Sequence, residues 1–172
     1  MSSSVLNSRG QLQTIVDISV EEGEKREATF KEYMMDKKGV DLVKKGKYKH
    51  YDFYPPYDKT LKVEFKSVNA SVNTYTNVLI GCDKISYYLY RKIRQPDYRF
   101  FLVYGFYDVD DRSKTLRVHY KYCEVDLEKF VKDYGRKVCH NKKHLFVPVN
   151  TLKPLKGLVD ILKQSVVQVI LQ

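Results

Sequence analysis

The segment Arg99–Val109 constrains the fold of this 172-residue chain more than any other. It is a strongly apolar run rich in β-branched and aromatic residues, which favour strands, and it is the best candidate for a central strand. Asp110–Ser113 then supplies polar turn residues, and a second strand is expected over Thr115–Tyr122. The chain is therefore expected to be built around a sheet.

Helical patterns on both sides of this strand pair predict layers around the sheet. Helices are expected where good helix formers are followed by stop signals such as Gly39, Pro96 and Gly135. The expected helices are Glu21–Lys37, Val78–Arg94, Val125–Tyr134 and Leu155–Val169, and the further expected strands include Val40–Val43 and Leu145–Val147. This order predicts an α/β fold with a mixed central β-sheet flanked by helices on both faces. Residues 1–172 are expected to form a single domain, with residues 1–14 as a loose N-terminal leader.

Charge is unevenly distributed along the chain. The net charge is +10, but residues 1–36 carry four basic and seven acidic groups, so residues 37–172 carry +13. A basic body of this kind favours nucleic acid or another polyanion as the partner.

The cysteines and the apolar runs indicate the compartment. Three scattered cysteines, an odd number, argue against a disulfide framework and for a reducing interior. The N-terminus lacks the long apolar stretch of a signal peptide, and no apolar run reaches the ~20 residues that a membrane span requires. The sequence predicts a soluble, intracellular, cytoplasmic protein with no membrane partner.

Two short runs, His50–Phe53 and Val63–Lys66, predict a β-hairpin with chemistry on one face. Pro55–Asp58 supplies the turn between them. Because strand side chains alternate, Glu64 and Lys66 are expected to point to one face while their neighbours point to the other. A hairpin symmetric about the turn places Asp52 directly opposite Glu64.

Two opposed carboxylates predict a cation between them. Directly opposed residues have Cβ atoms only ~4.5–5.5 Å apart, so Asp52 and Glu64 are expected to repel each other without one. Hard oxygen ligands at this separation suit Mg²⁺, with Mn²⁺ as an alternative, and Lys66 on the same face can hold a water. The alternative is a solvated strand face with a cross-strand charge pair. The pattern outlines a phosphodiester-cleaving site.

These residues resemble the PD-(D/E)XK nuclease superfamily. Tyr51-Asp52-Phe53 resembles the first motif, without the proline that gives the family its name, and Val63-Glu64-Phe65-Lys66-Ser67 resembles the second. The preceding helix carries Glu27 at the matching place. The resemblance implies a restriction-endonuclease-like fold and Mg²⁺-dependent hydrolysis that leaves a 3′-hydroxyl and a 5′-phosphate.

The resemblance also implies roles for individual residues. Asp52, Glu64 and the Phe65 carbonyl are expected to ligate the metal, and Lys66 to orient the attacking water and stabilise negative charge. Glu27 is expected to help hold a second metal or its water shell. On the helix, Glu27 shares a stripe with Phe30 and Met34, so it interrupts an apolar face. The other interpretation is that Glu27 lies at the edge of this stripe and extends to water.

Basic and polar residues near the hairpin predict contact with nucleic acid, with DNA favoured and RNA left open. The lysines precede the Asp52 strand, where they can hold phosphates that flank the scissile one. The expected contact residues are Lys44, Lys45, Lys47, Lys49, Asn69, Asn73, Tyr75 and Arg91. Endonuclease, exonuclease and branch-resolving activities stay open, as do a homodimer and a catalytically inactive binding module of the same fold.

Two other metal patterns receive less support. Asp108–Asp111 resembles the start of a calcium loop but lacks the required Gly and Glu, so it is interpreted as a hairpin turn. A zinc site would need scattered cysteines and histidines without a CxxC knuckle, and a zinc-stabilised interaction protein is the third hypothesis. The residues in question are Cys123, Cys139, His140 and His144.

Overall fold

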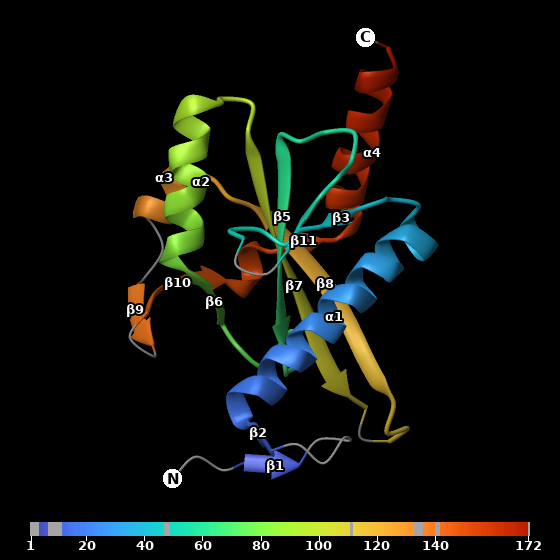
Figure 1. Cartoon of the computed structure of the whole chain (residues 1–172), viewed down its shortest axis with the longest axis vertical. Coiled ribbons are helices and arrows are strands. Elements are labelled where there is room, and N and C mark those ends of the chain that lie inside the picture. Colours follow the sequence, from blue (N-terminus) through green and yellow to red (C-terminus); the bar gives the residue numbers. More distant parts are fainter. Residues whose placement is uncertain are drawn as a thin grey trace.

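The computed structural model describes residues 4–6, 12–46, 49–110, 112–132, 136–139 and 142–171. Its largest element is a six-stranded mixed sheet (Figure 1). The strand order is β11 (Lys153–Pro154), β8 (Leu116–Glu124), β7 (Arg99–Val109), β5 (Leu61–Val68), β4 (Phe53–Tyr54) and β3 (Val43–Lys44). Only the β5–β7 pair is parallel in this sheet. The expected mixed α/β architecture is confirmed.

Strand β7 is central because it pairs along its length on both sides, with β5 in parallel and β8 in antiparallel register. The expected bounds of this strand, Arg99–Val109, agree with the structure. Its residues from Phe100 to Tyr107 are all buried, which is typical of a strand covered on both faces. The expected turn after β7 is also present, since Asp110 accepts hydrogen bonds from the backbone N–H groups of Arg112 and Ser113.

Helices cover both faces of this sheet (Figure 1). The helices are α1 (Ile15–Lys38), α2 (Cys82–Arg94), α3 (Leu127–Lys132) and α4 (Lys156–Ile170). On one face, Phe30 of α1 and Leu158 of α4 pack with Phe65 of the sheet in one apolar cluster. On the other face, α2 and α3 contribute to a second cluster around Leu102. Each sheet strand near the centre therefore meets helices on both sides.

The expected helix from Val78 to Arg94 is wrong in its first part. Asn77–Gly81 is a strand, β6, and α2 begins only at Cys82. Val78 and Ile80 are buried while their neighbours are not, so the segment has the alternation of a strand. It pairs with β10 (Lys142–Pro148), which also pairs with β9 (Arg136–Cys139), in a second sheet. The partner strand lies more than 60 residues away, and local sequence does not reveal it.

The N-terminal segment contains two short strands. Within the residues expected to be loose, β1 (Ser4–Leu6) pairs in antiparallel register with β2 (Leu12–Thr14). Helix α1 follows β2 at once and is longer at its N-terminus than expected. A single 3₁₀ turn, Val149–Thr151, connects β10 to β11. None of the described helices has both the length and the apolar character that crossing a membrane requires.

Candidate functional site

Strands β4 and β5 pair in the register that the sequence predicted. Phe53 of β4 lies opposite Val63 of β5, which is the register that aligns Asp52 with Glu64. Asp52 lies immediately before β4, and its backbone N–H donates to the Val63 carbonyl at 3.0 Å. Its carboxylate then reaches along β5, where Oδ2 accepts the Phe65 N–H at 2.7 Å. Asp52 is thus fixed to β5 through both backbone and side chain.

The expected alternation along β5 is also confirmed. Val63 and Phe65 pack in the cluster on the α1 face, where the Phe65 ring stacks on Phe30 with centroids 4.9 Å apart. Glu64 points to the other face and is fully buried, beside α2. A buried carboxylate is stable only when cations or hydrogen-bond donors surround it.

Two lysines surround the Glu64 carboxylate. Lys66 Nζ lies 2.7 Å from Glu64 Oε1, and Lys84 Nζ lies 3.2 Å from each of the two carboxylate oxygens. Lys84 also donates to the Lys49 carbonyl at 3.0 Å, so it ties α2 to the segment before Asp52. Glu64 Oε1 itself is buried and has no well-aligned hydrogen-bond donor among the described residues. The two ammonium groups therefore neutralise this oxygen mainly through charge.

Lys84 is not part of any site motif in the sequence. It lies in the first turn of α2, and nothing in its neighbourhood along the chain resembles a site motif. The only available signal is that Lys84 and Arg91 lie seven residues apart, which places both on one helical face. That face becomes functional only because α2 packs over β5, which is a tertiary feature.

The electrostatics of the carboxylate pair differ from those of solvated groups. Burial and the neighbouring Glu64 carboxylate raise the pKa of Asp52 to about 6, although the hydrogen bond from Phe65 opposes them. For Lys66, burial alone would lower the pKa, but Glu64 and other nearby carboxylates outweigh it and raise the pKa. Lys66 therefore stays protonated near neutral pH, whereas Asp52 loses its proton only near pH 6.

Glu27 of α1 lies on the edge of this site. Its side chain is 23% exposed, and Oε2 pairs with Lys44 Nζ at 3.1 Å. Burial and the charge of Asp52 raise the pKa of Glu27, and Lys44 opposes the shift. The structure thus brings Glu27, Asp52, Glu64 and Lys66 into one region, although Glu27 points to a lysine and not to the carboxylate pair.

The expected nucleic-acid contacts fall in different places. Lys44 pairs with Glu27, the carbonyl of exposed Lys49 accepts the bond from Lys84, and Lys47 lies outside the described residues. Asn69 accepts a hydrogen bond from Arg26 on α1. The side chains of Lys44 and Asn69 are therefore engaged with other parts of the chain, and Lys49 is engaged through its backbone carbonyl.

Two further expected contacts, Asn73 and Tyr75, line a cavity of about 500 Å³. Asn150 and Lys121 also line it, and neither carboxylate of the proposed site does. The structure therefore does not bring Asn73 and Tyr75 together with Asp52 and Glu64.

The remaining two, Lys45 and Arg91, lie near a lysine that sequence analysis missed. Lys62 of β5 is only 6% exposed, and its ammonium lies among tyrosine rings. Burial, Lys45 and Arg91 lower the pKa of Lys62 to about 8. The alternation of β5 places Lys62 on the same face as Glu64, but the sequence alone did not show that it would be buried.

The donor set fits a magnesium site better than a transition-metal site. No group of three or more His, Cys, Asp or Glu side chains that could hold a metal occurs in the part of the chain that the structure describes. Asp52 and Glu64 supply carboxylate oxygens, and the Phe65 N–H bond occupies Asp52 Oδ2. Mg²⁺ is commonly bound through one or two carboxylates and keeps several waters. The two carboxylates match this number of protein ligands.

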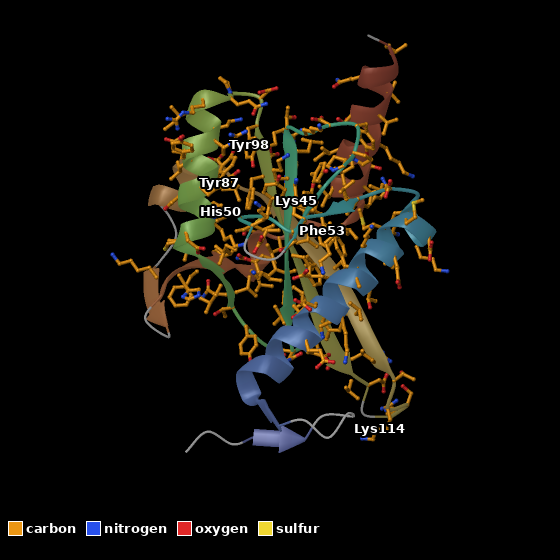
Figure 2. The ribbon with its side chains drawn as sticks, viewed as in Figure 1. Lys45, His50, Phe53, Tyr87, Tyr98 and Lys114 are labelled. Atoms are coloured by element: carbon orange, nitrogen blue, oxygen red, sulfur yellow. The ribbon has the colours of Figure 1, made fainter. Side chains whose placement is uncertain are left out.

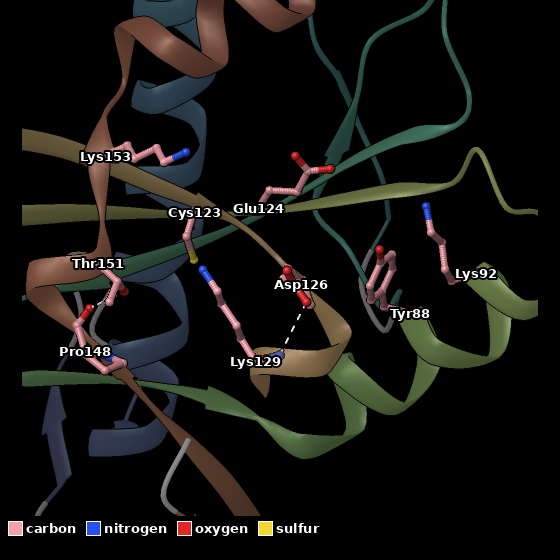
Figure 3. A pocket seen from close by; sticks show the side chains of 10 residues that line it. Tyr88, Lys92, Cys123, Glu124, Asp126, Lys129, Pro148, Thr151 and Lys153 are labelled. Carbon is pink, nitrogen blue, oxygen red and sulfur yellow. Dashed lines mark hydrogen bonds between the residues drawn. The ribbon is translucent and has the colours of Figure 1, made fainter. Parts of the chain in front are cut away.

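The proposed zinc ligands do not form a described cluster. His140 and the side chain of Cys139 lie outside the described residues, and Cys123 is buried in the apolar cluster on the α2 face. Cys123 also borders a cavity of about 730 Å³ next to α2 and α3 (Figure 3). Burial raises the pKa of this thiol to about 12, so it is not a nucleophile at neutral pH.

The acidic groups of that cavity are already engaged. Glu124 forms a two-bond pair with Arg99, at 2.7 and 2.8 Å. Asp126 accepts hydrogen bonds from the backbone N–H groups of Glu128 and Lys129 at the start of α3 (Figure 3). The carboxylates of this cavity are therefore structural, and the pair formed by Asp52 and Glu64 is the better candidate for chemistry.

The fold is similar to that of a solved viral protein. No protein-family model matches the sequence, and no curated protein matches it. The fold is similar to that of D212, a nuclease from a fusselovirus, with a TM-score of 0.46 and 16% sequence identity. The similarity covers 92% of this chain and 98% of that one. A likeness of this degree does not assign an activity, which has to come from the residues of the site.

Proposed function

We propose that this protein is a divalent-metal-dependent nuclease that hydrolyses phosphodiester bonds, with DNA as the preferred substrate. The observation that carries the proposal is the carboxylate pair of half-buried Asp52 and fully buried Glu64, with Lys66 beside it. Buried carboxylates that repel each other destabilise a fold, and a divalent cation removes the repulsion. Ionisable groups that are perturbed in this way cluster at functional sites.

Asp52, Glu64 and the Phe65 carbonyl hold the metal in this proposal. The Phe65 N–H fixes the Asp52 carboxylate through Oδ2, which leaves Oδ1 for the cation. A bound Mg²⁺, or Mn²⁺ in its place, would supply positive charge to a phosphoryl oxygen and acidify a water molecule. Glu27 would support a second metal or its water shell.

Lys66 acts on the substrate and the attacking water. Its side chain is 42% exposed while its ammonium lies 2.7 Å from Glu64, so it can reach both the buried carboxylate and a bound strand. Because its pKa is raised, it serves as a hydrogen-bond donor and a positive charge, and not as a base. Lys66 therefore orients the water and stabilises the charge that develops on the phosphate.

The activity is tested by incubating the purified protein with linear, circular, single-stranded and branched DNA, and with RNA, in Mg²⁺ or Mn²⁺. We expect metal-dependent products with 5′-phosphate ends on at least one DNA substrate, and none in EDTA. Resistant circles would indicate an exonuclease, and selective cutting of branches would indicate a resolvase. Absence of metal-dependent cleavage of every substrate contradicts the proposal.

A non-enzymatic nucleic-acid-binding module is the second candidate. The observation that favours it is the complete neutralisation of Glu64 by two lysines, Lys66 and Lys84. Such a protein would bind DNA or RNA with strong salt dependence and release no products. The substrate panel above separates the two candidates directly.

Lys84 should oppose metal binding, because its ammonium lies on the carboxylate that would hold the cation. Replacing it by Met keeps an unbranched side chain of nearly the same length and removes the charge. We expect Lys84→Met to tighten Mn²⁺ binding by about tenfold, equivalent to about 1.4 kcal/mol. Titration followed by electron paramagnetic resonance measures this affinity without reference to activity.

A matched control lies on the same helix. Lys92 is two turns further along α2 and, like Lys84, donates to a backbone carbonyl, that of Tyr98. Eight residues correspond to about 12 Å along a helix, so Lys92→Met should leave the affinity for Mn²⁺ unchanged. Equal affinities of the two variants would show that Lys84 does not compete with a metal.

A further inference from the structure

Three cationic side chains converge on a set of tyrosines next to the carboxylate pair. The Lys62 ammonium lies 4.9, 5.1 and 5.7 Å from the ring centroids of Tyr51, Tyr54 and Tyr98. Lys45 lies over the same Tyr54 ring at 5.0 Å, and Arg91 lies over the same Tyr98 ring at 5.5 Å. The three cations, Lys45, Lys62 and Arg91, are here called the cationic cluster.

No carboxylate among the described residues forms an ion pair with the cationic cluster. Asp58 is the acidic residue whose charge acts on Lys62, and its oxygens already accept hydrogen bonds from Thr60 and Ser165. Among the described residues, the Lys62 ammonium donates a hydrogen bond only to the Lys59 carbonyl. The three positive charges of the cationic cluster therefore lie close together, and no carboxylate of the described residues pairs with them.

Arg91 supplies a second, independent observation. Its Nε is buried and has no hydrogen-bond partner among the described residues. A buried donor without a partner costs free energy, and native proteins usually satisfy such groups with protein, water or ligand. The guanidinium presents its N–H groups in a planar fork that matches two oxygens of a phosphate.

The cationic cluster lies next to the carboxylate pair along strand β5. Lys62 and Glu64 are two residues apart on β5, so they share a face at a separation of roughly 7 Å. On α2, Arg91 lies two turns beyond Lys84, which pairs with Glu64. The same strand and the same helix thus position both the carboxylates and the cations.

Aromatic rings border this path. Figure 2 shows Tyr98, Tyr87 and His50 one after another along α2, to which Tyr87 belongs, with Lys45 to their right. The His50 and Tyr87 rings stack with centroids 4.2 Å apart and an interplanar angle of 10°. The tyrosine faces carry the ammonium groups of the lysines. Aromatic rings that stay accessible, such as those of exposed His50 and half-buried Tyr87, are surfaces on which bases can stack.

We infer that Lys45, Lys62 and Arg91 bind a phosphate group of the nucleic-acid strand, next to the phosphate that is cleaved. This subsite rests on the proposed nuclease function, which it deepens by naming a second contact with the strand. A phosphate supplies the missing anion for all three cations and an acceptor for the buried Arg91 Nε. The phosphate is either internal to the strand or at its 5′ end, and the test distinguishes the two.

The test measures binding in EDTA, where cleavage does not occur, by fluorescence anisotropy of a labelled single-stranded oligonucleotide. We expect Arg91→Gln and Lys62→Met each to weaken binding about tenfold. The plot of log affinity against log salt concentration should also become less steep. We expect its slope to fall in magnitude by about 1 for each variant, which corresponds to the loss of one phosphate contact. Thermal unfolding by circular dichroism verifies that each variant is folded, and Arg91→Gln alone suffices if Lys62→Met does not fold.

A matched control lies on α2. Arg94 also lies over a tyrosine ring, that of Tyr90 at 3.6 Å, but both residues are exposed. Arg94→Gln should change the affinity less than twofold.

Oligonucleotides with a 5′-phosphate and with a 5′-hydroxyl identify the source of the phosphate. Weakening of both by the variants indicates an internal phosphate, and weakening of the phosphorylated one alone indicates a terminal phosphate. Folded Arg91→Gln and Lys62→Met proteins with wild-type affinity and salt slope would overturn the inference. This result is distinct from failure of the nuclease proposal, which is loss of metal-dependent cleavage in the unchanged protein.

Discussion

Replacing Glu64 by Gln is expected to lower kcat/KM for metal-dependent DNA cleavage by about 10³-fold, or about 4 kcal/mol of transition-state stabilisation. Gln has the shape of Glu but no negative charge, so the metal loses one of its two carboxylates. Glu64 is fully buried, and its replacement by Ala would also create a cavity. Gln keeps the volume and an oxygen that can accept hydrogen bonds from Lys66 and Lys84.

The fold should tolerate this substitution. The side chains of Lys66 and Lys84 are 42% and 18% exposed, so both ammonium groups can turn towards water when Glu64 loses its charge. Circular dichroism and the midpoint of urea unfolding verify the fold, and Mn²⁺ titration should show weaker binding. Glu124→Gln is the matched control, since Glu124 is exposed and pairs with Arg99 away from the site. Wild-type cleavage by Glu64→Gln would exclude Glu64 as a metal ligand.

The local parts of this site could be predicted from the sequence because they depend on the period of a strand. Alternation along β5 separates Glu64 and Lys66 from Val63 and Phe65, and the turn after Tyr54 fixes the register. Strand β7 was identified by a different local signal, an apolar and aromatic run without alternation. Period and turn chemistry are local properties, so one sequence suffices to predict them.

Other parts of the site could not be predicted because they depend on packing between distant elements. Lys84 reaches Glu64 only because α2 crosses the face of β5, and β5 lies beside β7 through a parallel pairing that no hairpin dictates. Lys62 is buried for the same reason. Glu27 was predicted from its apolar stripe, and the structure adds its pairing with Lys44. The catalytic roles of these residues stay predictions.

The error at Val78–Ile80 has a similar cause. A short apolar run fits a buried helix or a buried strand equally well, and only the partner strand decides between them. That partner, β10, pairs with β6 across a separation of more than 60 residues. The consequence for the site is direct, because β6 sets the position at which α2 begins and hence the position of Lys84.

Replacing Asp52 by Asn is expected to stabilise the protein at pH 8, on the order of 2–3 kcal/mol, while removing metal binding. Burial and Glu64 raise the pKa of Asp52 from its ordinary value of 3.8 to about 6. A shift of about two pH units corresponds to that free energy. The amide introduced by Asp52→Asn would stay neutral at every pH, and its oxygen can still accept the Phe65 N–H.

The sign of the pH dependence follows from which state binds more protons. Since the folded pKa of Asp52 is above the unfolded one, the folded state holds the proton more tightly. The stability contributed by this group is complete below about pH 4 and is lost as the pH rises through about 6. The difference between Asp52→Asn and the wild type should therefore be large at pH 8 and absent near pH 4.

Urea unfolding in EDTA at pH 4, 6 and 8 measures this difference, with Asp97→Asn, an exposed site, as the control. Lower stability of Asp52→Asn than of the wild type at pH 8 would show that the Asp52 carboxylate is not destabilising. Addition of Mg²⁺ should then stabilise the wild type at pH 8, because a ligand that binds only the folded state raises its stability, and it should leave Asp52→Asn unchanged. A carboxylate that weakens the fold without a cation and strengthens it with one is the behaviour expected of a metal ligand, and a structural ion pair would not show it.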